Sequence, residues 1–554
     1  MQVADQGPAV WQSVHCRKRS APYLRRTVAP EGDAEQQEPA RRPPTAQQLA
    51  ALLGRQRAHL RRLTLAENAG HWDVPAEPMT AVLAAAEPMA AVLAAATGDG
   101  SGLTDLTLVI SEQLPDFVME TLPGSAAQLT SLVLRPLRGH IPFLRFAQFD
   151  GRLAQLRSLS LTGRFQTGEA AEQLSQLTAL TRLRLASAQP GQPDVSLALL
   201  ACPGGLARLE LFGVSVELLN VLHLAHMRWN PFPGFGPTDE QDHLIQQVHN
   251  LGLLPSPEEL AELESAAALA PPPAPGLLWP PAEGSIGALL LPRWQQLEHL
   301  RLHKCELDDS VFLALPRLKQ LTMLQLSAIV RTERAVAAVQ ECSRLQELVL
   351  GRLSTMPRDA YQLPAPTPGA LPQLTRLRLS GCEGLSRVDE AWCSLPNLLS
   401  FEVESCDDLT CPSLAGLTRV EQLVFSHQRL EHLPDSITGL TTLTRLAVTA
   451  CSLEQLRPGP YLRGLRELNL FANALRDVPE ALAHPHWGST ALHLLDMSSN
   501  HSHFLSDADV AVLGQLSVLT SLRLGRQEFD ASDAHPAGPL AALRVALPDC
   551  QINA

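Results

Sequence analysis

The sequence contains almost no lysine and few aromatic residues. Its only lysines are Lys18, Lys304 and Lys319, so nearly all of the 44 basic residues are arginine, a bias that we attribute to GC-rich codons rather than to function. Phe, Trp and Tyr make up 4% of the chain, so its core must be aliphatic. The formal net charge of −13 argues against nucleic acid as the main partner, because phosphate binding requires a basic face.

Long apolar runs and known catalytic motifs are also missing. No stretch approaches the roughly 18 apolar residues of a membrane helix, and the N-terminus lacks the apolar region of a signal peptide. The basic run at residues 17–19 is too short to indicate nuclear import. We therefore expect no membrane association and a cytoplasmic location, with cytoskeletal or ciliary association as an alternative and a nuclear one less favoured. The ten cysteines should then be reduced.

No short motif points to an enzyme. The sequence has no P-loop, no G-x-S-x-G, no H-E-x-x-H and no Cys-x-x-Cys pair. We therefore expect no catalytic residue, no metal ion and no cofactor.

What the sequence does contain is a recurring leucine skeleton. The segment that starts at Leu462 includes the pattern L-x-x-L-x-L-x-x-N-x-L. An anchor is the first residue of each L-x-x-L-x-L, and from Leu297 onward the steps between successive anchors are 24, 24, 29, 24, 22, 23, 22, 27 and 27. Before a gap the steps are 43, 26, 27, 24 and 26. The alternation within L-x-L indicates a strand rather than a helix. The anchors are Leu60, Leu103, Leu129, Leu156, Leu180, Leu206, Leu297, Leu321, Leu345, Leu374, Leu398, Val420, Leu443, Leu465, Leu492 and Leu519.

These segments resemble leucine-rich repeats over most of residues 55–530. The resemblance implies an α/β fold, a curved horseshoe solenoid with a parallel β-sheet on its concave face and helices and extended segments outside. The longer units, with steps of 26 to 29, have room for an outer helix, whereas the shorter units, with steps of 22 to 24, should return by more extended segments. CELDDSVFLALPRL resembles the cysteine-containing subtype, and LEHLPDSITGL resembles the L-P-x-x-I subtype of plant and algal repeats.

One position of the repeat is occupied by Asn or Cys. In leucine-rich repeats the residue three places after the second Leu of L-x-L satisfies backbone groups where the chain leaves the strand. We call this position the ladder slot. Here it predicts a structural role for Asn68, Cys305, Cys382, Cys406, Cys451, Asn473 and Asn500.

The segment EHLRLHKCELDD (298–309) allows three interpretations: half of a metal site, a reactive thiol beside a base, or a structural element. The ladder slot favours the structural reading for Cys305. His299 and His303 are then about 13 Å apart on one strand, too far to share one zinc ion. A ladder cysteine also faces inward, away from the exposure that reactivity requires.

The domain organisation follows the repeat pattern. We expect a partly disordered segment at 1–50, repeats at 51–213, an insertion at 214–291, repeats at 292–530 and a C-terminal cap at 531–554. The sequence of the insertion predicts two short helices and a Pro-rich spacer. The insertion is either a binding loop or a surface insertion that the fold tolerates. The decamers at 76–85 and 86–95 differ only at Thr80 and Ala90, which indicates a tandem duplication in an outer helix or loop.

The N-terminal segment allows a second comparison. PAVWQSVHCRK (8–18) resembles the last turn of an F-box, but the preceding F-box residues are missing. The segment is either an F-box remnant, which would make the chain a ubiquitin-ligase substrate receptor with a Skp-type adaptor, or the result of an incorrect start.

The expected function is non-catalytic protein–protein recognition by a monomer, through the concave face. A repeat-based GTPase activator is an alternative, although no arginine is singled out for catalysis. The pairs Arg184/Glu210 and Arg378/Glu402 hold the same position in adjacent units, so each pair either neutralises itself or fixes the register of a partner. Arg376 and Glu404 would enlarge the second pair into a docking centre. The candidate partner-binding residues are Arg184, Glu210, Arg301, Arg376, Arg378, Glu402, Glu404, Asn469, Asp496 and Arg523.

Overall fold

The computed structural model describes part of the chain: residues 13–14, 50–51, 55, 58, 60–67, 80–83, 93–96, 101–110, 128–136, 143–144, 153–165, 174–187, 202, 204–216, 294–307, 311–312, 315–329, 332–351, 361–382, 384–500, 505–524 and 538–553. The chain divides into two units, Met1–Leu297 and Glu298–Ala554. Asn68, the linker before residue 50 apart from 13–14, and the predicted helices of the insertion lie outside the described residues.

The first unit is a stack of parallel strands. Strands β2, β4, β5, β7, β8 and β9 pair in that order, each in register with the next. One Leu row runs through all six strands from Leu63 to Leu209, and its members are at most 2% exposed. The strands are β1 (Ser13–Val14), β2 (Arg62–Glu67), β3 (Thr80–Leu83), β4 (Asp105–Ile110), β5 (Ser131–Pro136), β6 (Phe143–Leu144), β7 (Ser158–Phe165), β8 (Arg182–Ser187), β9 (Arg208–Phe212) and β10 (Ser215–Val216).

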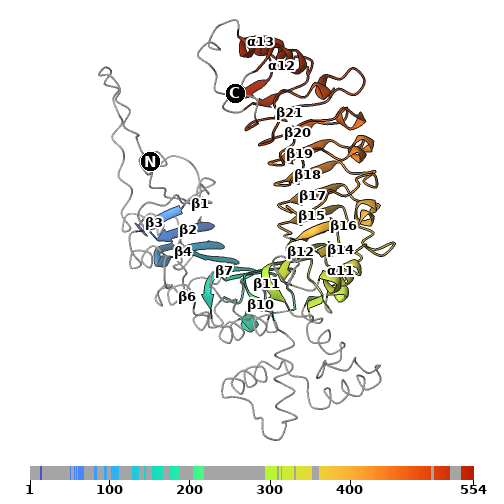
Figure 1. Ribbon diagram of the computed structural model, residues 1–554. Coiled ribbons are helices and arrows are strands. Elements are labelled where there is room, and N and C mark those ends of the chain that lie inside the picture. Colours follow the sequence, from blue (N-terminus) through green and yellow to red (C-terminus); the bar gives the residue numbers. More distant parts are fainter. Residues whose placement is uncertain are drawn as a thin grey trace, which may run out of the picture. The chain divides into compact units, whose positions relative to one another are not determined.

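The second unit repeats this arrangement over more turns. Its main sheet pairs β11, β12, β13, β15, β17, β18, β19, β20, β21, β22 and β23 in sequence, all parallel. Figure 1 shows these strands stacked one above another along one side of the second unit. Helical segments such as α11 lie along its other side. The strands are β11 (His299–Leu307), β12 (Met323–Ile329), β13 (Glu347–Leu350), β14 (Tyr361–Leu363), β15 (Arg376–Ser380), β16 (Leu385–Val388), β17 (Ser400–Glu404), β18 (Gln422–Ser426), β19 (Arg445–Thr449), β20 (Glu467–Asn469), β21 (Leu494–Asp496), β22 (Ser521–Arg523) and β23 (Gln551–Asn553).

The helices described in the second unit are few and short. They are η3 (Leu315–Arg317), α11 (Thr332–Gln340), η4 (Glu390–Ser394), η5 (Asp435–Gly439), η6 (Pro460–Leu462), η7 (Glu480–Ala483), α12 (Asp507–Leu513) and α13 (Pro539–Ala546). The expectation that only the longer units carry an outer helix is wrong, since α11 lies in the unit between the anchors Leu321 and Leu345, where the step is 24. Its buried side chains include Ala335 and Ala338, and such small residues let a helix pack closely within a short unit.

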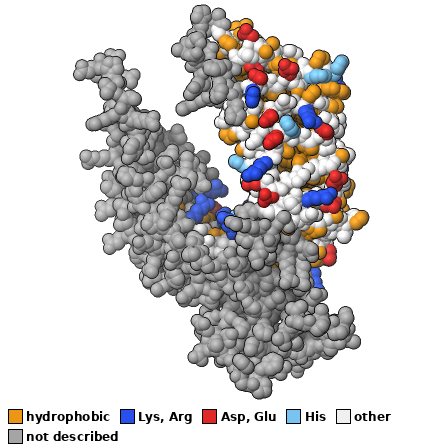
Figure 2. Space-filling model, in the orientation of Figure 1, with side chains coloured by type: hydrophobic (Ala, Val, Ile, Leu, Met, Phe, Trp, Pro, Cys, Tyr) orange, Lys and Arg blue, Asp and Glu red, His pale blue; other side chains and the backbone are white. Residues whose placement is uncertain are grey.

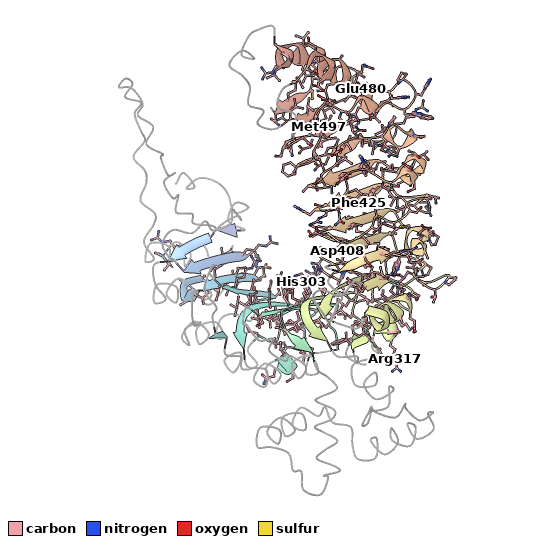
Figure 3. All side chains as sticks on the ribbon, viewed as in Figure 1. His303, Arg317, Asp408, Phe425, Glu480 and Met497 are labelled. Carbon is pink, nitrogen blue, oxygen red and sulfur yellow. The ribbon has the colours of Figure 1, made fainter. Side chains whose placement is uncertain are left out.

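The predicted leucine skeleton forms the core. Leu300, Leu377 and Leu446 occupy one row of the main sheet, and each is 0% exposed. Phe425 of β18 points into the same interior at 2% exposure (Figure 3). Burying one such side chain stabilises the fold by roughly 1.5–3 kcal/mol, but only because neighbouring units cover it. The α/β leucine-rich repeat solenoid predicted from the sequence is therefore confirmed.

A threonine row joins the units at the entrance to the strands. Thr322 Oγ1 donates to the Glu298 carbonyl at 3.2 Å, and Thr375 Oγ1 donates to the Gln346 carbonyl at 3.1 Å. The same bond to the preceding unit recurs at Thr104, Thr130, Thr181, Thr444 and Thr520. Each threonine directly follows an anchor leucine, so L-T-x-L is a second repeated signal that the leucine pattern alone did not reveal.

One of the two decamer copies differs from the sequence-based expectation of an outer helix or loop. The first decamer copy does not lie wholly in an outer helix or loop, because Thr80–Leu83 is strand β3 and pairs with β2. In the second copy the matching leucine, Leu93, lies in a helical turn and is 0% exposed. An open strand edge attracts any chain that can pair with it, and this tertiary contact overrides the shared local sequence. Near the C-terminus, β23 adds a further strand to the sheet.

Residues 13–14 bear on the F-box comparison. Ser13–Val14 is a two-residue strand, β1, that pairs in parallel with Arg62–Leu63 of β2. The described part of the segment compared with the last turn of an F-box is thus extended rather than helical.

Candidate protein-binding surface

The ladder slot is built by a left-handed residue followed by a buried one. Ser405, His427 and Ala450 have φ of 52°, 52° and 53°, and each directly precedes a slot residue. The same holds at Lys304, Gly381, Ala472 and Ser499. This φ turns the chain out of the strand, so the next side chain points inward toward backbone groups that have lost their sheet partners.

Asn473 shows what the slot does. Its Oδ1 accepts from the backbone N–H groups of Cys451 at 3.0 Å and Leu453 at 3.1 Å. Its Nδ2 donates to the carbonyls of Val448 at 2.6 Å and Leu470 at 3.0 Å. One side chain therefore satisfies four backbone groups of two units. Asn500 acts similarly, because its Oδ1 accepts from Leu475 and its Nδ2 donates to Leu470 and Met497.

The four predicted ladder cysteines are buried thiols at equivalent places. Each points its Sγ at the carbonyl two residues earlier, at 3.5 Å in Cys305, 3.3 Å in Cys406 and 3.1 Å in Cys451. Cys382 also donates to the Gly351 carbonyl at 3.2 Å. The pKa of Cys382 is raised by its hydrogen bond with Cys406 and by burial. The pKa of Cys451 is raised by burial, so Cys382 and Cys451 stay protonated and serve as donors, whereas the hydrogen bond with Cys382 lowers the pKa of Cys406.

Two further slot residues escaped the sequence reasoning. Val214 and Gln428 stand eight residues after the anchors Leu206 and Val420, as the other slot residues do after theirs, and they are 0% and 7% exposed. With its amide oriented to match its neighbours, Gln428 donates to the Cys406 carbonyl at 2.8 Å. The spacing alone could have found both, since the slot is defined by position rather than by residue type.

The histidines of the 298–309 segment lie on strand β11, on the opposite side from Cys305. His299 pairs in register with Met323 and His303 with Ser327, so the two rings belong to separate rows of the sheet. Burial, and then Lys304, lower the pKa of His303. Within the described residues, no group of three His, Cys, Asp or Glu side chains is placed to hold a metal ion. In the same part of the chain, no helix is long and apolar enough to cross a membrane.

The strand face carries rows of charged side chains that pair between neighbouring units. In the first unit Arg184 lies opposite Glu210, and their Nη1 and Oε2 atoms are 3.7 Å apart. In the second, Arg378 lies opposite Glu402 with 3.8 Å from Nε to Oε2. The register predicted from the leucine spacing thus brings both pairs together.

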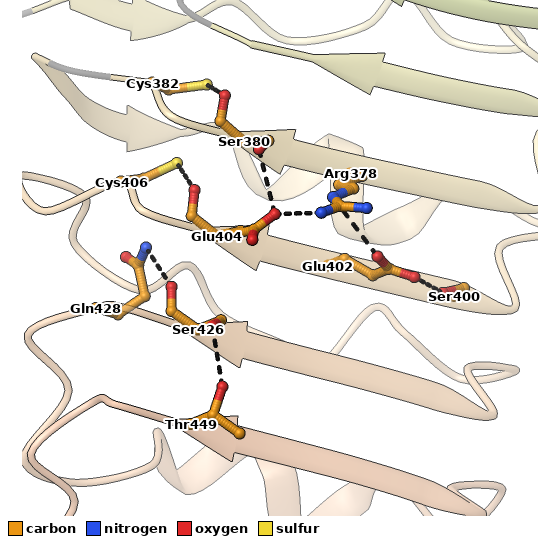
Figure 4. A network of polar contacts seen from close by, with 10 residues as sticks. All are labelled: Arg378, Ser380, Cys382, Ser400, Glu402, Glu404, Cys406, Ser426, Gln428 and Thr449. Carbon is orange, nitrogen blue, oxygen red and sulfur yellow. Dashed lines mark hydrogen bonds and ion pairs between the residues drawn. The ribbon is translucent and has the colours of Figure 1, made fainter. Parts of the chain in front are cut away.

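Arg378 makes its closer contact with Glu404 (Figure 4). Ser380 Oγ donates to Glu404, and Ser400 Oγ donates to Glu402 at 3.1 Å, so both carboxylates are held in place. The Arg378 hydrogen bond lowers the pKa of Glu404 below its usual range, and Glu404 in turn raises the pKa of Arg378.

Arg376 does not enlarge this cluster in the expected way. It lies opposite Ser400, and its ion-pair partner is Glu347 of β13 at 3.6 Å. Arg376 belongs to the row two residues before Arg378, because side chains alternate along a strand. In that row the acidic neighbour is Glu347 on β13, whereas β17 offers Ser400.

The remaining candidates lie on the same face. Asp496 is 3.4 Å from Arg523 Nη1, and Asn469 Oδ1 accepts from the backbone of Phe471 at 3.0 Å. Arg301 pairs in register with Gln325 and is half-buried. Apart from Arg376, the sequence reasoning missed the row two residues earlier, which contains Arg182, Arg208 and the pair Arg445–Glu467 at 3.1 Å.

Comparisons with known proteins find solved structures at low sequence identity. No family model and no curated protein sequence matches the chain. A leucine-rich repeat protein of Leptospira interrogans is 16% identical, with 84% of this chain and 92% of that one covered and a TM-score of 0.44. A TLR13–ssRNA13 complex is 17% identical, with coverage of 78% and 60% and a TM-score of 0.40. Internalin C2 from Listeria monocytogenes is 22% identical, with coverage of 38% and 83% and a TM-score of 0.29.

The fold assignment rests on the chain itself. Its strands recur at steps of 22 to 29 from Leu297 onward, they pair in parallel and in register, and an inward Asn or Cys follows many of them. With these three features, the chain has the leucine-rich repeat fold.

Proposed function

We propose that the chain is a non-catalytic recognition module that binds a protein partner through the solvent-facing side of its strands. The observation that carries this proposal is the regular display of polar and charged side chains on that face, one row per alternate strand position. The parallel register fixes their spacing at about 4.8 Å between units. A rigid, preorganised array of this kind loses little conformational freedom when a partner binds.

The composition of the face supports a protein partner rather than a small molecule. Figure 2 shows acidic, basic and uncharged side chains interspersed over the visible side of the second unit. Exposed ion pairs such as Arg445–Glu467 contribute roughly 0–1 kcal/mol to folding, so their stabilising effect alone gives little reason for the arrangement. Charge patterns of this type set the register and specificity of protein interfaces.

Site-specific photo-cross-linking tests the proposal. A photoreactive amino acid is placed at Val424 or Asn469 on the strand face, and at Thr438 in η5 as the control on the outer side. Val424 and Asn469 are half-buried at the surface, so a substitution there leaves the leucine core intact. We expect the same protein to be cross-linked in cells from both face positions and not from Thr438. Products from Thr438 alone, or from neither face position, would place the interaction elsewhere.

A further inference from the structure

Strands β8 and β9 of the first unit carry a concentration of positive charge. Arg182 and Arg184 of β8 lie on the same face as Arg208 of β9, because residues two apart on a strand point the same way. Arg182 is directly in register with Arg208. Like charges placed opposite each other on neighbouring strands destabilise a sheet, so folding by itself does not favour this arrangement.

One acidic residue, Glu210, lies among these arginines. Glu210 Oε1 is 2.6 Å from Arg208 Nη2, and Glu210 Oε2 is 3.7 Å from Arg184 Nη1. The Glu210 side chain is only 9% exposed, whereas those of Arg184 and Arg208 are 46% and 38% exposed. The carboxylate thus lies beneath the guanidinium groups and fixes them from below. Three arginines and one glutamate leave an excess of two positive charges on the solvent side.

The arginines are also held in position. Arg184 stacks over the ring of Phe212 with 4.5 Å from its Cζ to the ring centroid. Arg208 Nε donates to Glu210 at 2.7 Å. Arg182 is exposed and has no ion-pair partner among the described residues. The face therefore presents two oriented guanidinium groups and, beside them, the exposed guanidinium of Arg182.

The second unit differs in this respect. There, the strand-face arginines from Arg376 onward each have a carboxylate on a neighbouring strand: Arg376 with Glu347, Arg378 with Glu402 and Glu404, Arg445 with Glu467 and Arg523 with Asp496. The charge there is balanced within the face. The excess on β8 and β9 contrasts with that balance, and it occurs in a chain whose net charge is −13.

We propose that the face of β8 and β9 binds an acidic segment of a partner protein, with Arg182, Arg184 and Arg208 contacting its Asp or Glu carboxylates. This proposal rests on the protein-recognition function above and names the chemistry of one partner. A guanidinium group matches a carboxylate with two parallel hydrogen bonds, and the exposed Arg182 is the best placed of the three to form them.

Nucleic acid fits this face less well. The one aromatic ring of β9, Phe212, is covered by Arg184 and cannot stack on a base. Two nearby positive charges suit a pair of carboxylates better than a long polyanion.

A peptide-binding assay tests the proposal on the full chain. The probe is a fluorescent eight-residue peptide of alternating Glu and Asp, and the controls are a Gln/Asn peptide and a single-stranded oligonucleotide of the same length. We expect the acidic peptide to bind at least tenfold more tightly than the Gln/Asn peptide at 50 mM salt. The difference should shrink at 500 mM salt, because exposed charges are screened.

Matched arginine variants locate the binding. Arg182→Gln with Arg208→Gln should weaken binding of the acidic peptide at least fivefold. Arg445→Gln, at the equivalent strand position of β19, should leave binding within twofold of the native value. Arg182→Gln alone removes a side chain without an ion-pair partner among the described residues. Its melting temperature should therefore match the native protein, and its binding should still fall.

Three results would overturn the inference: equal binding of the acidic and Gln/Asn peptides, equal losses for the β8–β9 and β19 variants, or tighter binding of the oligonucleotide that the arginine variants abolish. If any of these occurs while Val424 and Asn469 still cross-link a protein, the recognition function stands and only the acidic-segment assignment fails.

Discussion

Asn473 accepts a hydrogen bond from the backbone N–H of Cys451, the residue that holds the same slot in the preceding unit. This slot residue thus supports the turn of the unit before it as well as its own. The repeated Asn or Cys is therefore a link between units. Its replacement should destabilise the contact between neighbouring units rather than a single strand.

Replacing Asn473 by Ala should destabilise the second unit by about 3 kcal/mol, because it leaves several buried backbone groups without partners. Asn473→Cys should cost less, since Cys fills the same slot elsewhere in the chain. Asn397→Ala, at a more accessible position outside the slot, is the control. Urea unfolding followed by circular dichroism measures the difference, and a loss below about 1 kcal/mol for Asn473→Ala would contradict the role assigned to the slot.

The ladder thiols should resist alkylation in the native protein. Cys305, Cys382, Cys406 and Cys451 are each at most 1% exposed, and reagents attack the exposed thiolate. Intact-mass analysis after iodoacetamide treatment should show these four unlabelled, whereas Cys550, which is partly exposed, should be labelled. Labelling of the four at the rate seen in denaturant would refute the assignment.

The second unit should lose stability in alkali. Burial raises the pKa of Cys342 and of Cys393 to about 12, from 9.0 in the unfolded chain. A raised pKa in the folded state means that stabilisation is complete below pH 9 and is lost as the pH rises toward 12. Each thiol should lower the free energy of unfolding by about 1.4 kcal/mol per pH unit within that window.

Urea unfolding at pH 8, 9, 10 and 11 measures this slope. Cys342→Ala with Cys393→Ala should make the decline above pH 9 shallower than in the native protein. An unchanged slope in the double variant would show that other groups cause it.

Reversing the pair Arg378/Glu402 should weaken partner capture if that part of the face is used for docking. The structure changes the design of the experiment, because Arg378 contacts Glu404 more closely than Glu402, and a carboxylate introduced at position 378 would face Glu404. Arg378→Glu with Glu402→Arg and Glu404→Gln avoids this repulsion. We expect its melting temperature to stay within about 3 °C of the native value.

The readout is recovery of the cross-linked partner from Val424. Full recovery with the triple variant would move the docking centre elsewhere, for which the insertion at 214–291 is the next candidate. Arg445→Glu with Glu467→Arg reverses a pair in another row and serves as the control.

Deleting residues 86–95 should leave the fold nearly intact. The leucine of the remaining decamer copy would then take the buried position of Leu93. A fully buried leucine stabilises the fold more than a short edge strand does. The cost should be the loss of β3, seen as faster hydrogen exchange in Arg62–Glu67 with a melting temperature lowered by no more than a few degrees. Unchanged hydrogen exchange in β2 would show that the remaining copy does not take the place of the deleted one.

The sequence alone determined the repeat, the parallel register and the place of the ladder residues. The constant spacing of leucines within each L-x-x-L-x-L forces equivalent residues into the same row, so Arg184 had to lie beside Glu210 and Arg378 beside Glu402. The inward position of Cys305 followed in the same way and answered the question raised by its neighbouring histidines. These conclusions depend only on the period of the chain, which the order of residues states directly.

The tertiary structure decided which neighbours interact. Arg378 lies opposite Glu402 in the sheet yet bonds more closely to Glu404, and Arg376 turns to Glu347. Side chains of this length reach several carboxylates, and the choice depends on rotamers and competing partners that no spacing encodes. The same reason separates the two decamer copies: nearly identical residues become an edge strand in one place and a buried helical turn in the other, because the surrounding chain offers each a different contact.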